Sequence, residues 1–223
     1  MEVKKLINSV IREEQHLDGV ANIIPVLKRN RKIQICIDFR DLNVACPKDK
    51  FSFPITDAMI NNTCGFDRMS FMDGFSGYNQ IKMYSKDEKH TSFRIPLGVY
   101  CYTVMPFGLK NTRATYQREM NTIFHEHIRN TVECYVDDIA VKRCDKGNHI
   151  VDLKRIFDIM RAHQLKMNPS KSFLGVASGK FLRFIVISKG IHVDLEKVLT
   201  IQEMQHPRNL KKLRGLQGCL AYI

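Results

Sequence analysis

The sequence lacks tryptophan, long apolar runs and closely spaced cysteine pairs. Its seven cysteines are scattered and odd in number, which argues against a disulfide framework or a zinc site and for reduced thiols in an intracellular protein. Apolar stretches near the start are interrupted by Arg12, Glu13 and Glu14, so neither a signal peptide nor a membrane span is expected. Repeats and low-complexity segments are also missing, which excludes solenoids and disordered tails.

The chain is long enough to bury a core, and its charge is unbalanced. Its 223 residues are 44% hydrophobic and 26% charged, an ordinary globular mixture. Thirty-five Lys and Arg against 23 Asp and Glu give a net charge of +12. Such an excess favours a polyanionic partner, because binding to phosphates releases counterions. A basic protein that is only soluble is the alternative that composition leaves open.

Hydrophobic periodicity predicts that strands and helices alternate along the chain. Strands are expected over Val20 to Leu27, Lys32 to Phe39, Arg68 to Asp73, His90 to Pro96, Tyr100 to Val104, Thr131 to Tyr135, Ile139 to Lys142, Phe181 to Ile187 and Ile191 to Val193. Helices are expected over Ile55 to Asn62, about Asn111 to Ile128, about Asn148 to His163, from Asp194 to about Met204, and from Leu210 onward. Antiparallel hairpins interleaved with helices predict an α+β fold, in which helices cover one face of an antiparallel sheet.

The tetrapeptide Tyr135-Val136-Asp137-Asp138 joins two of these strands. Adjacent carboxylates within apolar sequence are costly to bury unless a cation neutralises them, and a tight hairpin turn could bring both to a cleft. Asp73 ends another apolar strand, and if the strands are neighbours, Asp73 and Asp137 meet at one edge. Such a site could hold two divalent cations for phosphoryl transfer, and hard oxygen ligands favour Mg²⁺. A solvated Asp-Asp turn is the simpler alternative.

Four segments follow one another in a fixed order. They are Ile37-Asp38-Phe39-Arg40-Asp41-Leu42-Asn43, Phe71-Met72-Asp73-Gly74-Phe75-Ser76-Gly77-Tyr78-Asn79-Gln80, Met105-Pro106-Phe107-Gly108-Leu109-Lys110 and Tyr135-Val136-Asp137-Asp138. In order and spacing they resemble the motifs of gypsy-type LTR retrotransposon reverse transcriptases, the polymerase domain of a Pol polyprotein. The resemblance covers nearly the whole chain and implies an RNA-directed DNA polymerase that binds an RNA or DNA template with a primer, and dNTP.

The resemblance also implies a right-hand polymerase fold. Fingers would span residues 1–49 and 81–111, and the palm residues 50–80 and 112–192. Residues 193–223 would form the connection and the start of a truncated thumb, without ribonuclease H or integrase. An intracellular location, cytoplasmic or nuclear or both, is expected because the sequence shows no secretion signal.

By position, Asp73, Asp137 and Asp138 resemble the family's catalytic carboxylates. The resemblance implies that Asp73 and Asp137 bind both Mg²⁺ ions, which Mn²⁺ could replace. Lys171 resembles a lysine that could protonate the departing pyrophosphate.

Other positions resemble the family's substrate contacts. Tyr78 matches the aromatic residue that excludes a ribose 2′-hydroxyl, although a packed core tyrosine is the alternative. Phe107 and Gly108 match the floor of the nucleotide pocket, and Lys28 matches the residue that grips the triphosphate, unless it only faces solvent. The positions expected to contact nucleic acid are Arg40, Phe181, Leu182 and Arg183, the last three matching the primer grip.

Some positions depart from the family's usual residues. Gln34 stands where Arg or Lys is common, Arg31 replaces a turn glycine, and Arg183 replaces a glycine that lets the primer backbone approach. Two interpretations follow: a polymerase core, or a degenerate non-catalytic remnant that at most binds nucleic acid. A two-metal nuclease is a third, but it would leave Tyr78 and Phe107 without a purpose.

Overall fold

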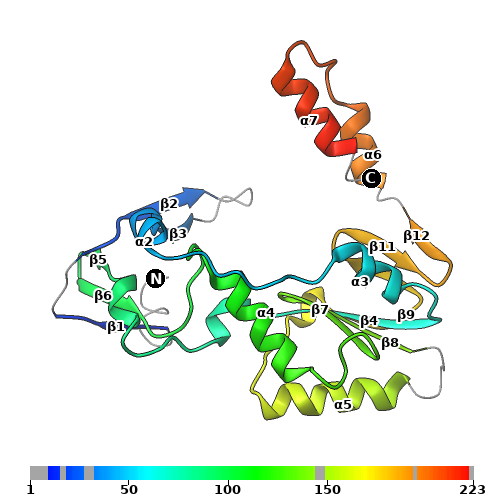
Figure 1. The fold of residues 1–223 in the computed structure, drawn as a ribbon, viewed down its shortest axis with the longest axis horizontal. Helices are drawn as coiled ribbons and strands as arrows, with labels where there is room; N and C mark the ends of the chain where they lie inside the picture. Colours follow the sequence, from blue (N-terminus) through cyan, green and yellow to red (C-terminus); the bar gives the residue numbers. More distant parts are fainter. Residues whose placement is uncertain (1–9, 16–18, 28–32, 144–148, 193–194, 221–223) are drawn as a thin grey trace. The chain divides into compact units, whose positions relative to one another are not determined.

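The computed structural model describes residues 10–15, 19–27, 33–143, 149–192 and 195–220 (Figure 1). Two compact units each use two stretches of chain, namely Met1–Phe53 with Gly74–Ile123, and Pro54–Asp73 with Phe124–Ile223. The boundaries of fingers, palm and thumb stay a prediction, because a division by packing does not assign roles. The sequence predictions for Lys28, Arg31 and the side chain of Gln34 fall outside the described parts.

The first unit contains a three-stranded sheet, a strand pair and short helices. Its sheet has the order β1-β6-β5 and is antiparallel, and β2 pairs antiparallel with β3 as expected for a hairpin. The elements are β1 (Ile11–Glu13), β2 (Ile23–Leu27), β3 (Ile33–Ile37), α2 (Arg40–Ala45), η1 (Gly77–Gln80), η2 (Glu88–Thr91), β5 (Phe93–Ile95), β6 (Gly98–Tyr102) and α4 (Thr112–Ile123).

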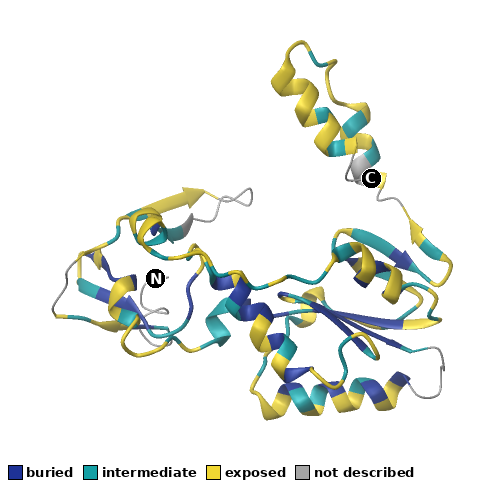
Figure 2. Cartoon of the chain, viewed as in Figure 1, coloured by how far each residue is buried: buried dark blue, intermediate teal, exposed yellow. Residues whose placement is uncertain are grey.

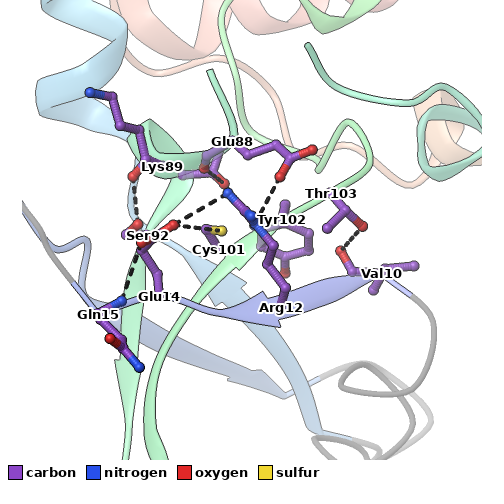
Figure 3. Close-up of polar contacts among 11 residues, drawn as sticks. Val10, Arg12, Glu14, Gln15, Glu88, Lys89, Ser92, Cys101, Tyr102 and Thr103 are labelled. Carbon is purple, nitrogen blue, oxygen red and sulfur yellow. Dashed lines mark hydrogen bonds and ion pairs between the residues drawn. The ribbon is translucent and has the colours of Figure 1, made fainter. Parts of the chain in front are cut away.

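Charged side chains fasten β1 to the neighbouring segments of this unit (Figure 3). Arg12 Nε lies 2.9 Å from a Glu88 oxygen, and Arg12 Nη2 lies 3.3 Å from a Glu14 oxygen. Cys101 lies beside this cluster and is fully buried, and burial raises the pKa of its thiol. These ion pairs therefore hold β1 in place, and the buried Cys101 thiol is not accessible to solvent.

The second unit is built around a four-stranded antiparallel sheet in the order β7-β8-β4-β9. Its central strands are dark in the burial view, and β4 is buried from Met69 to Met72 (Figure 2). The elements are α3 (Thr56–Thr63), β4 (Arg68–Asp73), β7 (Val132–Tyr135), β8 (Asp138–Arg143), α5 (His149–Ala162), η3 (Pro169–Lys171), β9 (Phe173–Val176), β10 (Ser178–Phe181), β11 (Phe184–Ile187), β12 (Gly190–His192), α6 (Leu195–Gln202) and α7 (Leu210–Leu220).

Helices cover both faces of this sheet, so the expectation of one covered face was wrong. Phe71 belongs to a core shared with Met59 of α3 and Phe181 of β10. Ser70 faces the opposite side, where its hydroxyl lies 2.8 Å from Nε2 of His149 in α5. Neighbouring residues of a strand point to opposite faces. Because β4 is uncharged on both faces from Met69 to Met72, it needs a cover on each.

The long helix predicted to reach Ile128 ends earlier. Helix α4 stops at Ile123, and the amides of His127 and Ile128 both donate to the carbonyl of Phe124 in a tight turn. Arg129 then adopts a left-handed backbone with φ of +66°, after which the chain enters β7. The apolar spacing thus continues past the end of the helix, because Phe124 is buried and Ile128 is half-buried in the turn that follows.

The segment Phe181 to Ile187 is a hairpin and not the single strand that we expected. Strand β10 ends at Phe181 and β11 begins at Phe184, which pair across a two-residue turn. Leu182 and Arg183 form that turn with φ of +49° and +72°. Asp194, the expected cap of α6, lies outside the described residues.

Helices α6 and α7 complete the described chain, and α7 carries a mixture of apolar and basic residues. Within the described ranges, no helix has the length and apolar content that crossing a bilayer requires.

Candidate active site

The two adjacent aspartates lie where β7 turns into β8. Tyr135 pairs with Asp138, which leaves Val136 and Asp137 as a two-residue turn. Val136 is 4% exposed and has φ of +54°, whereas Asp137 is exposed. A left-handed valine costs about 1–2 kcal/mol, so its burial must hold the turn in place. The turn thereby presents the Asp137 carboxylate to solvent at the edge of the sheet.

Asp73 lies directly beside this turn. In the pairing of β4 with β8, Asp73 is opposite Asp138, so the three aspartates lie together at one edge. The neighbouring segment at η3 is tied to Asp73, because the Asn168 amide donates to the Asp73 carbonyl at 2.8 Å. Lys171 from η3 places its Nζ 3.2 Å from Asp73 Oδ2, with 64% of the lysine side chain exposed. The sequence prediction that Asp73 and Asp137 share an edge agrees with this register.

The carboxylates repel one another. The pKa of Asp138 is raised to about 6, first by burial and then by the charges of Asp137 and Asp73. Lys171 and Arg183 act in the opposite direction, which places Arg183 of the β10–β11 turn in the electrostatic surroundings of this edge. A cation bound here would relieve the repulsion.

The donor set suits an open cation site more than a closed one. Across the described parts of the chain, no three His, Cys, Asp or Glu side chains converge closely enough to form a complete ligand set. Mg²⁺ commonly takes one or two protein carboxylates and completes its shell with water and substrate phosphates. One or two of the aspartates at this sheet edge would be enough protein ligands for that kind of coordination.

The residues predicted to grip the primer differ in exposure. Phe181 is 2% exposed and its ring centre lies 6.1 Å from that of Phe71, so its side chain belongs to the core. Leu182 also packs against this core. Arg183 shares the turn, which leaves the turn backbone and the arginine as the parts that could reach a phosphate.

A second group of predicted residues lies in the first unit. Tyr78 on η1 packs its ring edge-to-face against Phe107 and Tyr116, with ring centres 4.9 and 5.5 Å apart. Phe107 is 57% exposed, so one wall of this aromatic cluster faces solvent. Gly108 has φ of +99°, and a Cβ there would lie 3.4 Å from the Phe39 ring. Glycine at this position lets the loop approach the ring closely.

Asn43 holds this loop, although our sequence reasoning assigned it no role. Its Nδ2 donates to the Gly108 carbonyl at 2.7 Å, and its Oδ1 accepts from the Lys110 amide at 2.7 Å. The Lys110 ammonium donates to the carbonyls of Asn43 and Cys46 at 3.0 and 2.7 Å. The sequence feature that could have indicated this role is that Asn43 belongs to the first of the four motifs and Lys110 to the third.

Arg40 begins α2 and pairs with Asp38 at 2.6 Å, with 85% of its side chain exposed. Hydrogen bonds from Arg40 lower the pKa of Asp38. The pairing orients the guanidinium while leaving much of it open to solvent.

Comparison with known proteins identifies the family. Residues 26–186 match the family model described as reverse transcriptase (RNA-dependent DNA polymerase). This chain belongs to the reverse transcriptase family.

The retrotransposon assignment expected from the four motifs is confirmed by two relatives. The retrovirus-related Pol polyprotein from transposon opus of Drosophila melanogaster is 31% identical over 86% of this chain and 19% of its own length. The Transposon Tf2-3 polyprotein of Schizosaccharomyces pombe is 26% identical over 97% of this chain and 16% of its own length.

This reverse transcriptase chain therefore spans about a fifth or less of those relatives. Solved structures with the same fold include the foamy viral protease-reverse transcriptase in complex with dsDNA, with a TM-score of 0.89 and 22% identity over 99% of this chain and 46% of that one. The same protein in complex with an RNA/DNA hybrid gives a TM-score of 0.85 and 21% identity over 99% of this chain and 30% of that one. The expected polymerase fold is thus confirmed.

Proposed function

We propose that this chain is an RNA-directed DNA polymerase core that transfers a nucleotide from dNTP to a primer 3′-hydroxyl. The observation that carries the proposal is the strand register, which sets Asp73 opposite Asp138 with Asp137 on the adjoining turn. Carboxylates gathered from separate strands at one edge can supply ligands to the two cations that such phosphoryl transfer uses.

Two Mg²⁺ ions, or Mn²⁺ in their place, are the cations proposed for this site. Asp73 and Asp137 would bind both ions and Asp138 would support them, in keeping with the motif positions. The raised pKa of Asp138 supports a cation site, because it reflects negative charge that remains uncompensated. When bound, the cations would make the 3′-hydroxyl more acidic and neutralise charge on the phosphates.

Lys171 is proposed to donate a proton to the departing pyrophosphate. Its ammonium is held near the site by the Asp73 carboxylate at 3.2 Å, yet its side chain is largely exposed. A lysine that is guided by one carboxylate and open to solvent can move toward an anionic leaving group.

Tyr78 and Phe107 are proposed to form the surface that selects the sugar of the incoming nucleotide. Their edge-to-face packing fixes the Tyr78 ring, which is the property that a steric gate needs. Tyr78→Ala is expected to admit ribonucleotides, measured as the ratio of dTTP to UTP incorporation. Tyr78→Phe, which keeps the ring, is the matched control and should discriminate like the unchanged chain. Unchanged discrimination in Tyr78→Ala would remove Tyr78 from the gate.

The proposed macromolecular partner is an RNA or DNA template with its primer. Exposed Arg40, and Arg183 in the β10–β11 turn, supply guanidinium groups suited to phosphate. The net charge of +12 supports the same partner.

The first test is primer extension on poly(rA) with oligo(dT), dTTP and Mg²⁺. The unchanged chain is expected to extend the primer, and Asp137→Asn is expected to abolish extension while leaving template-primer affinity nearly intact. The reason is that arginine and lysine carry binding, whereas the carboxylates carry chemistry. Equal loss of binding and extension in Asp137→Asn would contradict this separation of roles.

A non-catalytic remnant that only binds nucleic acid is the second candidate. The observation that favours it is Arg183, an arginine with φ of +72° where the family usually has glycine. Under this alternative the folded chain would bind template-primer without Mg²⁺ and extend nothing.

A further inference from the structure

Glu133 of β7 and Lys142 of β8 form an ion pair inside the second unit. Their side chains are 2% and 3% exposed, and Lys142 Nζ lies 2.7 Å from Glu133 Oε1. The same Nζ donates to the carbonyl of Asn62 at 2.6 Å, in the last turn of α3, and lies 5.6 Å from the centre of the Phe66 ring. One buried ammonium thus joins two strands and a helix.

The pair lies on the sheet face that carries the carboxylates. Residues two apart on a strand point the same way, so Lys142 shares a face of β8 with Asp138, and Glu133 shares a face of β7 with Tyr135. Asp138 and Lys142 are four residues apart, or roughly 13 Å along a strand. Any effect of the pair on chemistry must therefore pass through the strands.

Stability alone does not account for the pair. Its neighbours on this face are apolar, including Ile60, Met69 and Ala140, each 2% exposed or less. Replacing a buried ion pair by apolar side chains of similar volume is often neutral or stabilising. Apolar side chains, however, can pack against one another at several relative positions of the two strands. An ammonium bound to one carboxylate and one carbonyl accepts few geometries, so the pair specifies position.

The position that it specifies is the register of β7 against β8. A slip of one residue would turn Glu133 to the opposite face of the sheet and separate it from Lys142. The same slip would change the two-residue turn that carries Asp137, and with it the position of Asp137 relative to Asp73. The hydrogen bond to Asn62 adds α3 to this constraint, and α3 packs on the core that includes Phe71, two residues before Asp73.

We infer that Glu133 and Lys142 are positioning residues, which fix the β7–β8 register and so keep Asp137 and Asp138 beside Asp73. This inference rests on the proposed function, because the proposed function is what requires the aspartates to bind a cation. The pair contacts neither substrate nor cation, and it acts through the backbone of β7, β8 and α3.

The experiment compares the unchanged full chain with Glu133→Leu, Lys142→Met and the double variant Glu133→Leu/Lys142→Met. Each single variant leaves one buried charge and should lower the melting temperature, whereas the double variant should melt at or above the temperature of the unchanged chain. A surface double variant, Asp158→Asn/Arg161→Gln, removes an exposed ion pair of α5 and serves as the matched control.

Two readouts separate positioning from folding. In the double variant, kcat for dTTP incorporation is expected to fall by at least about tenfold, since small displacements of reacting groups are costly, while the Kd for template-primer stays unchanged. The affinity for Mn²⁺ in the absence of substrate is expected to fall by about tenfold, because loss of the residues that orient metal ligands weakens metal binding by that order. The concentration of free Mn²⁺, measured by electron paramagnetic resonance, gives this affinity. The surface control should change neither value.

An arrangement test adds the exchanged pair Glu133→Lys/Lys142→Glu. It keeps two opposite charges but sets a carboxylate against the Asn62 carbonyl, so it should restore neither kcat nor Mn²⁺ affinity. Lys142→Arg keeps the charge and the donors and should retain more of both than Lys142→Met.

The outcomes separate the two claims. If the folded double variant keeps the kcat and Mn²⁺ affinity of the unchanged chain, the positioning role is overturned. If the unchanged chain extends no primer, the proposed function fails, and the Mn²⁺ measurement still decides the positioning role. If Mn²⁺ binding to the unchanged chain does not depend on Asp137, tested with Asp137→Asn, both claims fail.

Discussion

Arg183 has a backbone conformation that arginine seldom adopts. At φ of +72° an L-residue with a Cβ is strained by about 1–2 kcal/mol, which glycine would avoid. Arg183→Gly is therefore expected to raise the free energy of unfolding by roughly 1 kcal/mol, measured by urea titration. If the guanidinium binds a phosphate, the variant should also lower the slope of log Kd against log salt by about one unit for template-primer.

Arg129 provides the matched control for this strain. It has φ of +66° in the turn before β7, away from the β10–β11 turn in sequence. Arg129→Gly should give a similar gain in the free energy of unfolding and leave the salt slope unchanged. An unaltered slope in Arg183→Gly would show that this arginine makes no phosphate contact.

The sequence allowed part of the carboxylate site to be predicted. Asp137 and Asp138 lie between two apolar segments, so a hairpin turn was a physical expectation. That Asp73 lies opposite Asp138 depends on β4 pairing with β8, and local periodicity contains no information about which strands are neighbours. The positive φ of Val136 and the bonds of Asn43 were equally out of reach, because they arise from packing.

At the level of single elements, β10 packs against β4 through a glycine. A Cβ on Gly179 would lie 2.2 Å from Cδ2 of Phe71, which is far inside contact distance. Gly179→Ala is expected to lower the free energy of unfolding by about 1–3 kcal/mol, because the buried ring must move. Gly179→Ala/Phe71→Leu should recover part of the loss, and thermal unfolding followed by circular dichroism measures both.

Gly215 is the contrasting position. It lies in α7, and a Cβ there meets nothing within 4 Å. Gly215→Ala should therefore stabilise the helix by roughly 0.5–1 kcal/mol. A loss at Gly215 equal to that at Gly179 would mean that the clash with Phe71 is not the cause.

Helix α5 meets the sheet through a histidine whose charge is disfavoured. His149 is 2% exposed, and burial lowers its pKa, with Arg68 also lowering it and Asp152 raising it. As the pH falls, His149 is therefore protonated in the unfolded chain before it is protonated in the folded chain. The stability that depends on a neutral His149 is complete above about pH 6.5 and is lost as the pH falls through the folded-state pKa.

The expected result is a pH-dependent difference between two proteins. The free energy of unfolding of the unchanged chain should fall more between pH 7.5 and pH 5.5 than that of His149→Gln, in urea titrations at both pH values. The comparison with the variant is needed because Asp138, with a pKa raised to about 6, titrates in the same range with the opposite sign. Parallel curves for the two proteins would contradict the role of His149.

Strands and helices were predictable where their periodicity was unbroken, as in β4, β8 and α5. Strand β1 has three residues and helix α2 has six, which is too short for either period to be recognised. The β10–β11 hairpin was missed for another reason. Its turn is Leu182-Arg183, and neither residue type is a usual turn former, so Phe181 to Ile187 looked continuous.

For the whole molecule, the excess of basic residues predicts how binding responds to salt. If the chain, with its net charge of +12, neutralises at least two phosphates, its affinity for template-primer should drop by at least about tenfold between 50 and 200 mM KCl. Fluorescence anisotropy of a labelled duplex would measure the change. Affinity that is indifferent to salt would mean that charge is not the basis of binding.

Because the second unit is built from two separate stretches of chain, strands that pair in its sheet leave the ribosome at different times. Strand β4 lies between β8 and β9, but β8 begins about 65 residues after β4 ends. At usual translation speeds, β4 emerges roughly 3–13 s before its first partner. During that time Met69, Phe71 and Met72 have no sheet to cover them. Chaperone supply and codon-dependent translation speed between residues 74 and 137 should therefore influence the yield of folded protein more than the same changes after residue 143.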